Sequence, residues 1–308
     1  SWGASPEAKL CKMPNTVIAF DTSNYTTSCA VFDGETGVNS GRLLDVEPGQ
    51  LGLRQSDALY AHIRRLPQVM EGLDLRDKRI IAVGASTKPR EAEDSWMPCF
   101  LAGASQGAVL GKALGVPFLE FSHQQGHIAA AAWSSGRADL LDTPHLCWHL
   151  SGGTTELLYV RPQASAVTCR IIGETSDVSA GQLVDRAGQL LGLPFPSGRE
   201  LDRLAQEASQ DIYYEPKVTG CTFSLSGVEH KMKQLFKTSV QPCNIARFTL
   251  LSVAAAVSRA TENALKEYGN LPVLFSGGVA SNSLLRQKMP CGVFADPKYS
   301  VDNALGVA

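Results

Sequence analysis

Two similar polar turns, each placed between two short apolar runs, are the feature of this 308-residue chain that most constrains its fold. The first turn, 21–27, lies between the runs 16–20 and 28–32. The second turn, 151–155, lies between 145–150 and 156–160. Short apolar runs joined by a small, hydroxyl-rich turn are typical of β-hairpins. The second half of the chain is therefore expected to repeat the opening of the first half.

Apolar patterns elsewhere alternate between strands and helices. Further strands are predicted at 80–85, 116–121 and 273–275, and helices at 56–70, 100–114, 182–191, 198–208, 244–268 and 283–288. Pro67 is expected to bend or end the first of these helices. The alternation indicates an α/β protein, and the length favours two domains, because single cores stop growing at roughly 250–300 residues.

Composition excludes several classes of protein. Lys and Arg number 28 against 30 acidic residues, so a chain with a net charge of −2 is not expected to hold nucleic acid without a local patch or a partner. No apolar run reaches the roughly 18 residues of a membrane span. The segment 1–12 lacks the apolar core of a signal peptide, and a tag or disordered tail is expected there. Eight widely spaced cysteines favour reduced thiols in the cytoplasm.

Three polar turns at strand ends are candidates for binding phosphate. The turns 21–27 and 151–155, facing each other across a cleft, would offer backbone N–H groups to a polyphosphate. The turn 276–282 has a strand before it and a helix after it, an arrangement that also binds phosphate or ribose. Such turns are common, however, and their pairing can be chance. Asp185, expected at the start of a helix, either accepts ribose hydroxyls or places a favourable charge in the first helical turn.

Two histidines four residues apart are candidates for binding a metal. His123 and His127 follow Ser122, a predicted helix cap, and that spacing places both imidazoles on one helical face. They are either metal ligands or ordinary hydrogen-bonded histidines. Asp302 is a candidate third ligand, and two imidazoles with one carboxylate suit zinc or iron. The motif H-Q-Q-G-H has glutamine where a metallopeptidase of the H-E-x-x-H type needs a glutamate base, which disfavours that activity.

Taken in order along the chain, these motifs are similar to one family, the TsaD-like (glycoprotease-type) tRNA threonylcarbamoyladenosine transferases. The resemblance extends from about Val17 to the C-terminus. The segments that carry it are D-T-S at 21–23, H-Q-Q-G-H at 123–127, S-G-G-T-T at 151–155, G-E-T-S-D-V-S-A-G-Q-L-V-D-R at 173–186, L-L-G-L-P-F-P-S-G at 190–198, F-S-L-S-G at 223–227, S-G-G-V-A-S-N at 276–282 and V-D-N at 301–303.

The resemblance implies the ASKHA (actin/Hsp70/sugar-kinase-like) fold, with two duplicated lobes around a nucleotide cleft. The expected lobes are 13–122 and 123–308, the second with a helical insert and with its last residues returning to the first lobe. One divalent metal, iron or zinc, is expected on His123, His127 and Asp302. ATP or an acyl-adenylate is expected on Ser151, Gly152, Gly153, Thr154, Asp185, Gly198, Gly277, Gly278 and Asn282, with a candidate phosphate turn at Thr22, Ser23 and Thr26.

The implied reaction moves a threonylcarbamoyl group from its adenylate to the N6 amine of a tRNA adenosine. The implied partners are a smaller ASKHA-like subunit and a P-loop ATPase, and a dimer is a further expectation. The chain departs from the family pattern: its first turn has no acids at 23–27, and Thr87–Arg90 replaces A-G-P-G. Thr154 stands where the family usually has His or Asn, and Gln182 stands where it usually has Glu. A divergent paralogue is therefore expected.

Three activities are weighed on this basis, and no catalytic residue is assigned. The first is the transferase reaction. The second is a nucleotide-binding partner or regulator without transferase activity. The third, a sugar-kinase-like phosphotransferase, would need a general base, for which Asp21 is the candidate, and would leave the paired histidines without a purpose.

Overall fold

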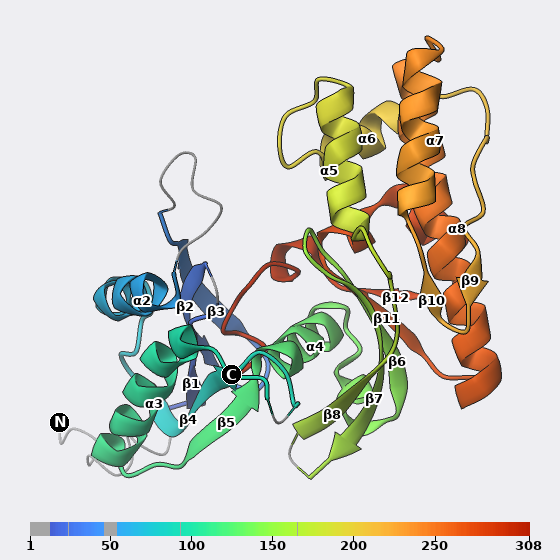
Figure 1. Cartoon of the computed structure of the whole chain (residues 1–308). Coiled ribbons are helices and arrows are strands. Elements are labelled where there is room, and N and C mark those ends of the chain that lie inside the picture. The colour runs from blue at the N-terminus through green and yellow to red at the C-terminus, as the bar shows by residue number, and fades with distance from the viewer. Residues whose placement is uncertain (1–12, 24, 46–53, 93, 165) are drawn as a thin grey trace, which may run out of the picture. The chain divides into compact units, whose positions relative to one another are not determined.

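The computed structural model describes residues 13–23, 25–45, 54–92, 94–164 and 166–308, which form two compact units (Figure 1). Unit 1 comprises the described residues of Ser1–Ala130 together with Asp302–Ala308, and unit 2 comprises those of Ala131–Val301. The division falls after Ala130, eight residues beyond the boundary expected at 122, and the last seven residues belong to unit 1. The expected tail 1–12 and Asn24 in the first turn lie outside the described residues.

Unit 1 is built on a five-stranded sheet of order β3-β2-β1-β4-β5. Its strands are β1 (Asn15–Asp21), β2 (Thr26–Phe32), β3 (Gly37–Leu43), β4 (Arg79–Lys88) and β5 (Phe118–Ser122). The first three form an antiparallel meander, whereas β4 pairs parallel with both β1 and β5. The predicted strand 16–20 is therefore the central strand of this sheet.

Two helices, α2 (Gln55–Met70) and α3 (Leu101–Leu114), pack against this sheet and lie side by side (Figure 1). A short 3-10 turn, Pro98–Phe100, leads into α3. The small residues of α3 permit this close packing, because a Cβ on Gly107 would lie 2.6 Å from the ring of Phe118. The helix α2 continues through Pro67 to Met70, so that proline does not end the helix, which was one of the two effects expected of it.

Unit 2 repeats the same topology with a sheet of order β12-β11-β6-β7-β8. A meander of β6 (His145–Leu150), β7 (Thr155–Gln163) and β8 (Ala166–Glu174) is followed by β11 (Val273–Ser276) and β12 (Val293–Phe294), which are parallel to β6. The strand β6 begins and ends at the predicted residues. The duplication predicted from the two hairpins is thus present in the strand order of both sheets.

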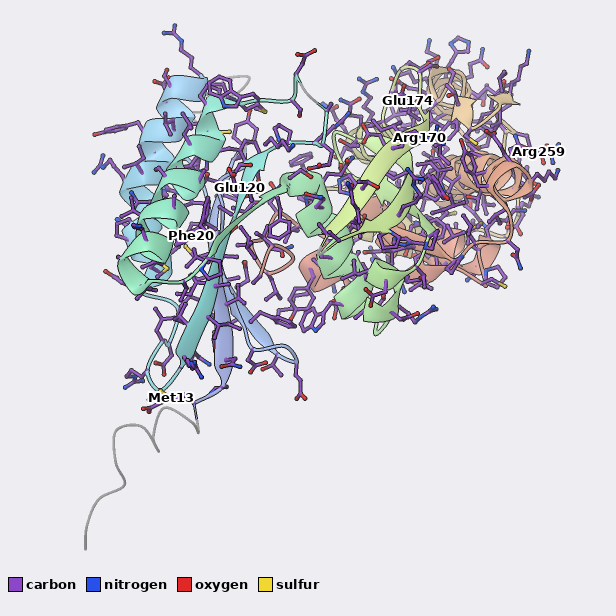
Figure 2. All side chains as sticks on the ribbon, turned by 90° about the horizontal axis from the view of Figure 1, so that it is seen from below. Met13, Phe20, Glu120, Arg170, Glu174 and Arg259 are labelled. Carbon is purple, nitrogen blue, oxygen red and sulfur yellow. The ribbon has the colours of Figure 1, made fainter. Side chains whose placement is uncertain are left out.

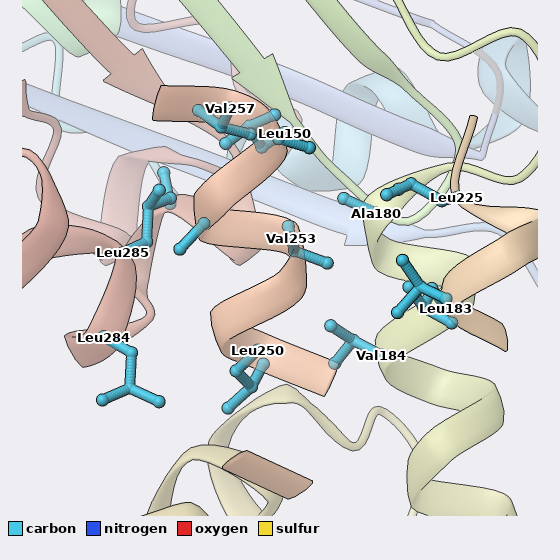
Figure 3. Packing of buried hydrophobic residues seen from close by; sticks show 14 of the residues in the cluster. Leu150, Ala180, Leu183, Val184, Leu225, Leu250, Val253, Val257, Leu284 and Leu285 are labelled. Carbon is cyan, nitrogen blue, oxygen red and sulfur yellow. The ribbon is translucent and has the colours of Figure 1, made fainter. Parts of the chain in front are cut away.

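Helices form the core of unit 2 together with this sheet. They are α5 (Ala180–Leu190), α6 (Gly198–Ala205), α7 (Ser226–Lys237), α8 (Pro242–Tyr268) and α9 (Ser283–Lys288). A further helix, α4 (His123–Ser134), begins in unit 1. The remaining elements are the β9–β10 ribbon (Val218–Thr219 and Thr222–Phe223) and 3-10 turns at Ala138–Asp142, Gly278–Ser281 and Pro297–Tyr299. Figure 3 shows Val253 and Leu250 of α8 among side chains from α5 and α9. No helix in the described ranges has both the length and the apolar character that a bilayer span requires.

Candidate functional site

The helix α4 places His123 and His127 in its first two turns. Its start is fixed by reciprocal bonds: the Ser122 hydroxyl accepts the N–H of Gln125 at 3.2 Å, and Oε1 of Gln125 accepts the N–H of Ser122 at 2.7 Å. This is the capping-box arrangement, and it begins at the predicted cap. The two imidazoles then lie on one face with their Nε2 atoms 2.9 Å apart.

A crossing of two glycines brings the C-terminal segment to these histidines. A Cβ on Gly306 would lie 1.8 Å from the carbonyl oxygen of Gly126, the residue that precedes His127. Only glycine permits that approach without a shift of the backbone. Within unit 1, Oδ1 of Asp302 then lies 3.4 Å from Nε2 of His123 and 3.3 Å from Nε2 of His127.

Asp21 is a fourth member of this cluster, which sequence reasoning did not assign to it. Its Oδ2 lies 2.7 Å from Nδ1 of His123, and its Oδ1 accepts the N–H of Ser23 at 2.9 Å. The carboxylate is 1% exposed, at the end of the central strand β1. The signal in the sequence was an aspartate directly after a buried apolar run. It could have been found only by asking which side chain orients a metal-binding histidine.

The two carboxylates make this cluster favourable for positive charge. Burial of His123 lowers its pKa, but the charges and hydrogen bonds of Asp21 and Asp302 outweigh burial and raise the pKa to about 10. Burial of Asp302 raises its pKa, but the two histidines hold it well below its usual range. A divalent cation could therefore take the place of the proton on His123.

The donor atoms of this cluster suit a metal ion. Metal bonds of about 2.0–2.2 Å at tetrahedral angles put ligand atoms roughly 3.4 Å apart. The three contacts among Nε2 of His123, Nε2 of His127 and Oδ1 of Asp302 are 2.9, 3.4 and 3.3 Å. Asp21 on Nδ1 of His123 is the carboxylate that typically orients a metal-binding imidazole. These residues fit the expected divalent metal, and the donor set is compatible with either zinc or iron.

The candidate phosphate turn of unit 1 is closely tied to this cluster. The Thr22 hydroxyl donates to the carbonyl of Cys99 at 2.9 Å and accepts the N–H of Gly103, so it is engaged within the fold. The Thr26 hydroxyl donates to Oδ2 of Asp302 at 3.4 Å. The Ser23 hydroxyl is buried beside Asp21 and helps to lower the pKa of that carboxyl, so it also lies next to the cluster.

In unit 2, the structure brings two of the glycine turns together. The turn 151–154 follows β6, and the turn 277–278 follows the neighbouring parallel strand β11. Gly277 has φ +90°, and a Cβ there would lie 2.2 Å from the carbonyl oxygen of Leu150. Glycine is therefore required for this approach, which places Ser151, Gly152, Gly153 and Thr154 beside Gly277 and Gly278 at the carboxyl end of the sheet.

The N-terminus of α5 abuts the same turn. The Ser179 hydroxyl donates to the carbonyl of Gly152 at 2.8 Å, and the N–H of Gly181 donates to the carbonyl of Ser151 at 3.2 Å. Gln182, one of the departures from the family pattern, closes a capping box with Ser179. Gly152 and Gly153 remain exposed, with no atom within 4 Å of a Cβ placed on them.

Asp185 lies in the middle of α5, so the expectation that it stands in the first helical turn is wrong. The helix begins at Ala180 because Ser179 caps it and Thr155 accepts the N–H of Ala180. Oδ1 of Asp185 accepts the N–H of Ser197 at 2.9 Å, directly before Gly198 at the start of α6. Asp185 and Gly198 are thereby held next to each other.

Asn282 caps α9 and is held by a residue that sequence reasoning missed. Its Oδ1 accepts the N–H of Leu285 at 2.9 Å, and its Nδ2 donates to Oδ1 of Asp202 at 3.1 Å. Asp202 of α6 also accepts the N–H of Ser283. All nine predicted nucleotide-binding residues therefore belong to unit 2, whereas His123, His127 and Asp302 belong to unit 1.

Comparison with known proteins identifies the family. The model of the TsaD family, described as tRNA N6-adenosine threonylcarbamoyltransferase, matches residues 96–308. The chain belongs to the TsaD family. Among curated relatives of that name, the one from Streptococcus sanguinis is 30% identical over 290 residues, covering 89% of this chain and 82% of the relative. The one from Thermus thermophilus is 32% identical over 281 residues, covering 88% and 83%.

Solved structures confirm the ASKHA-like fold class, with two mixed α/β lobes. Full-length HypF in a phosphate- and nucleotide-bound form has a TM-score of 0.60 at 14% identity, covering 96% of this chain and 54% of that chain. Component A of the Acidaminococcus fermentans (R)-2-hydroxyglutaryl-CoA dehydratase has a TM-score of 0.54 at 17% identity, covering 95% and 96%. At these identities the likeness shows the fold alone.

Proposed function

We propose that this TsaD-family chain transfers a threonylcarbamoyl group from its adenylate to the N6 amine of a tRNA adenosine, with one divalent metal, iron or zinc. The observation that carries the proposal is the cluster of His123, His127 and Asp302, oriented by Asp21, in a chain whose relatives bear that name. A bound divalent ion would supply Lewis acidity toward an acyl or carboxylate oxygen.

The residues around this metal site hold its ligands in position. Asp21 accepts the proton on Nδ1 of His123, which leaves Nε2, the atom on the side of Asp302, to serve as the metal ligand. The Thr26 hydroxyl donates to the second oxygen of Asp302, which leaves Oδ1 for the ion. Orientation of all three ligands before substrate arrives lowers the cost of assembling the site.

In unit 2, we propose that the adenylate binds at the carboxyl end of the sheet. The exposed backbone of Gly152, Gly153 and Gly278 would donate N–H groups to its phosphate, with Ser151, Thr154 and Gly277 shaping the two turns. Oδ2 of Asp185, beside Gly198, would accept ribose hydroxyls, and Asn282 would contribute from the start of α9. Ser23 in unit 1 is the further candidate for phosphate.

The proposal extends to partners and compartment. A smaller ASKHA-like subunit and a P-loop ATPase are proposed partners, with a homodimer as an additional state. The formal net charge of −2 supports this, because a chain with so little positive charge gains from partners that help to hold tRNA. The seven cysteines in the described ranges carry free thiols, which supports a reducing cytoplasm.

Metal analysis combined with a transfer assay tests the proposal. Purified wild-type protein is expected to contain a divalent metal, and the H123A and H127A variants are expected to lose it. The H230A variant, which removes an exposed histidine of α7, is the matched control and should keep the metal. With threonylcarbamoyl-adenylate and unmodified tRNA supplied, mass spectrometry of the digested tRNA should show the modified adenosine for wild type and H230A only.

Each result separates the proposal from its alternative. A wild type that binds ATP and metal but forms no modified adenosine, with or without partner proteins, would support a nucleotide-binding regulator instead. The lack of acids at Ser23, Tyr25 and Thr26 motivates that alternative. A wild type whose melting temperature is unchanged by both ATP and metal would contradict both functions.

A further inference from the structure

A small basic recess lies on the β7–β8 hairpin of unit 2, away from the residues considered above. Its volume is about 270 Å³, and its lining consists of Tyr159, Arg161, Thr168, Cys169 and Arg170. No carboxylate contributes to that lining. Ligand pockets for small molecules are mostly apolar and roughly 300–1,000 Å³ in volume, so this polar recess falls outside that class.

The register of the two strands puts the polar side chains of this recess on one face. Tyr159 pairs with Arg170, and Arg161 pairs with Thr168, in the antiparallel ladder. Directly opposite residues of such a ladder project to the same side, and so do residues two apart along one strand. Both arginines therefore project from the same face of the hairpin, near the edge strand β8.

Aromatic rings, and no acidic groups, hold the two guanidinium groups. The Arg161 and Arg170 guanidinium carbons lie 5.9 and 6.0 Å from the centre of the Tyr159 ring, and Arg170 lies 5.6 Å from that of Tyr268. Among the described residues neither arginine forms an ion pair. Other exposed arginines do so, among them Arg76, Arg137, Arg203 and Arg259. Glu267 interacts with Tyr268 but does not line the recess.

Two uncompensated positive charges on one face favour an anionic partner. Arg170 donates one N–H to the Tyr268 hydroxyl at 3.2 Å, and the remaining N–H groups of the two guanidinium groups match the geometry of a phosphate. The Thr168 hydroxyl donates to the carbonyl oxygen of Arg161 at 3.4 Å, so the guanidinium groups must supply the donors for a phosphate. Basic side chains interleaved with aromatic rings are typical of surfaces that bind nucleic acid backbones.

We propose that Arg161 and Arg170 bind the phosphate backbone of tRNA. This inference rests on the proposed function for the identity of the RNA. The chain has a net charge of −2, so any contact that it makes with RNA itself, beside those of its partners, needs a local patch such as this one. The strand β7 starts at Thr155, next to the turn 151–154, and reaches Arg161 after six residues, or about 20 Å. About six stacked nucleotides at roughly 3.4 Å each span that length.

Binding of unmodified tRNA transcript to the full chain tests this proposal. Affinity is measured by fluorescence anisotropy between about 50 and 300 mM salt, for wild type and for R161Q/R170Q. The matched control is R76Q/R259Q, which removes the same charge from two exposed, ion-paired arginines. Figure 2 labels Arg170 on β8 and Arg259 on α8, at separate places in unit 2.

The R161Q/R170Q variant is expected to bind about tenfold more weakly, and the salt dependence of its log affinity should fall by about 1.5, since each lost phosphate contact removes roughly 0.7–0.9. Each single variant should lose about threefold, and the control should stay within about twofold of wild type. Because both side chains are exposed, the melting temperature should not change.

Two outcomes would overturn the inference: equal tRNA affinity and salt dependence for R161Q/R170Q and the control, or no tRNA binding by wild type at the lowest salt. The metal content of every variant is measured in parallel. If the wild type modifies tRNA and R161Q/R170Q binds tRNA with unchanged affinity, the role of this surface in RNA binding is refuted but the proposed function stands. Loss of affinity in that variant, with a wild type that makes no modified adenosine, supports the surface and refutes the transferase.

Discussion

Replacing Asp21 with asparagine tests how this cluster prepares its ligands. Both hydrogen-bonded neighbours of the carboxylate are donors, the N–H of Ser23 on Oδ1 and Nδ1–H of His123 on Oδ2. Asparagine has one acceptor and one donor end, so it can satisfy only one of them. If its NH₂ group faces His123, the ring must carry its proton on Nε2, where the metal would bind. If it faces Ser23, a buried N–H loses its partner.

The magnitude follows from the role of Asp21 behind the ligand. Loss of such an orienting carboxylate typically weakens metal affinity 10- to 100-fold, about 1.4 to 2.8 kcal/mol. Asp21 also favours the proton that competes with the metal, because its charge helps to raise the pKa of His123 to about 10. Zinc affinity of the wild type should therefore rise about tenfold per pH unit below that value, and D21N should show a flatter rise.

Competition titration of metal-free protein with zinc and a chelating dye, between about pH 7 and 9, measures both effects. The full deficit of D21N should be visible at the upper end, where proton competition in the wild type is weakest. The variant D74N, which changes an exposed carboxylate of unit 1, is the control and should match the wild type. A folded D21N with wild-type affinity and wild-type pH dependence would refute the orienting role of Asp21.

Three further changes test the fold. Gly306→Ala places a Cβ 1.8 Å from the carbonyl of Gly126, so thermal unfolding should show a loss of about 1–3 kcal/mol, with weakened zinc binding. Asp177 accepts N–H bonds at the start of α7, and D177A should cost about 1 kcal/mol. Burial raises the pKa of Asp177, but a serine hydroxyl and backbone N–H groups lower it to about 2. The stability that the ionised carboxylate adds is therefore complete above pH 3.8 and should be lost as the pH falls toward 2. Acid unfolding of D177N should lack this loss. Leu183→Ala should cost about 2–5 kcal/mol in denaturant unfolding, because that side chain is fully buried in unit 2.

The sequence was most informative where local chemistry sets the structure. The helix cap at Ser122 was predictable because its hydrogen-bond partner, the N–H of Gln125, is only three residues away in the sequence. The polar strands β3 and β8 and the helix α7 were not predicted, since edge strands and surface helices carry no continuous apolar run. The error at Asp185 has a similar cause, because a side chain from another strand, Thr155, helps to fix the start of α5.

By itself, the sequence determined the duplicated hairpins, the spacing of His123 and His127 and the family, since each is contained in a short segment or in the order of segments. The sequence named Asp302 as a candidate third ligand, but only the tertiary structure showed that both Asp302 and Asp21 lie at those histidines. Asp21 lies 102 residues from His123 along the chain, and Asp302 reaches it through the contact of Gly126 with Gly306. Contacts of such separation depend on how strands and helices pack, and no local pattern encodes them.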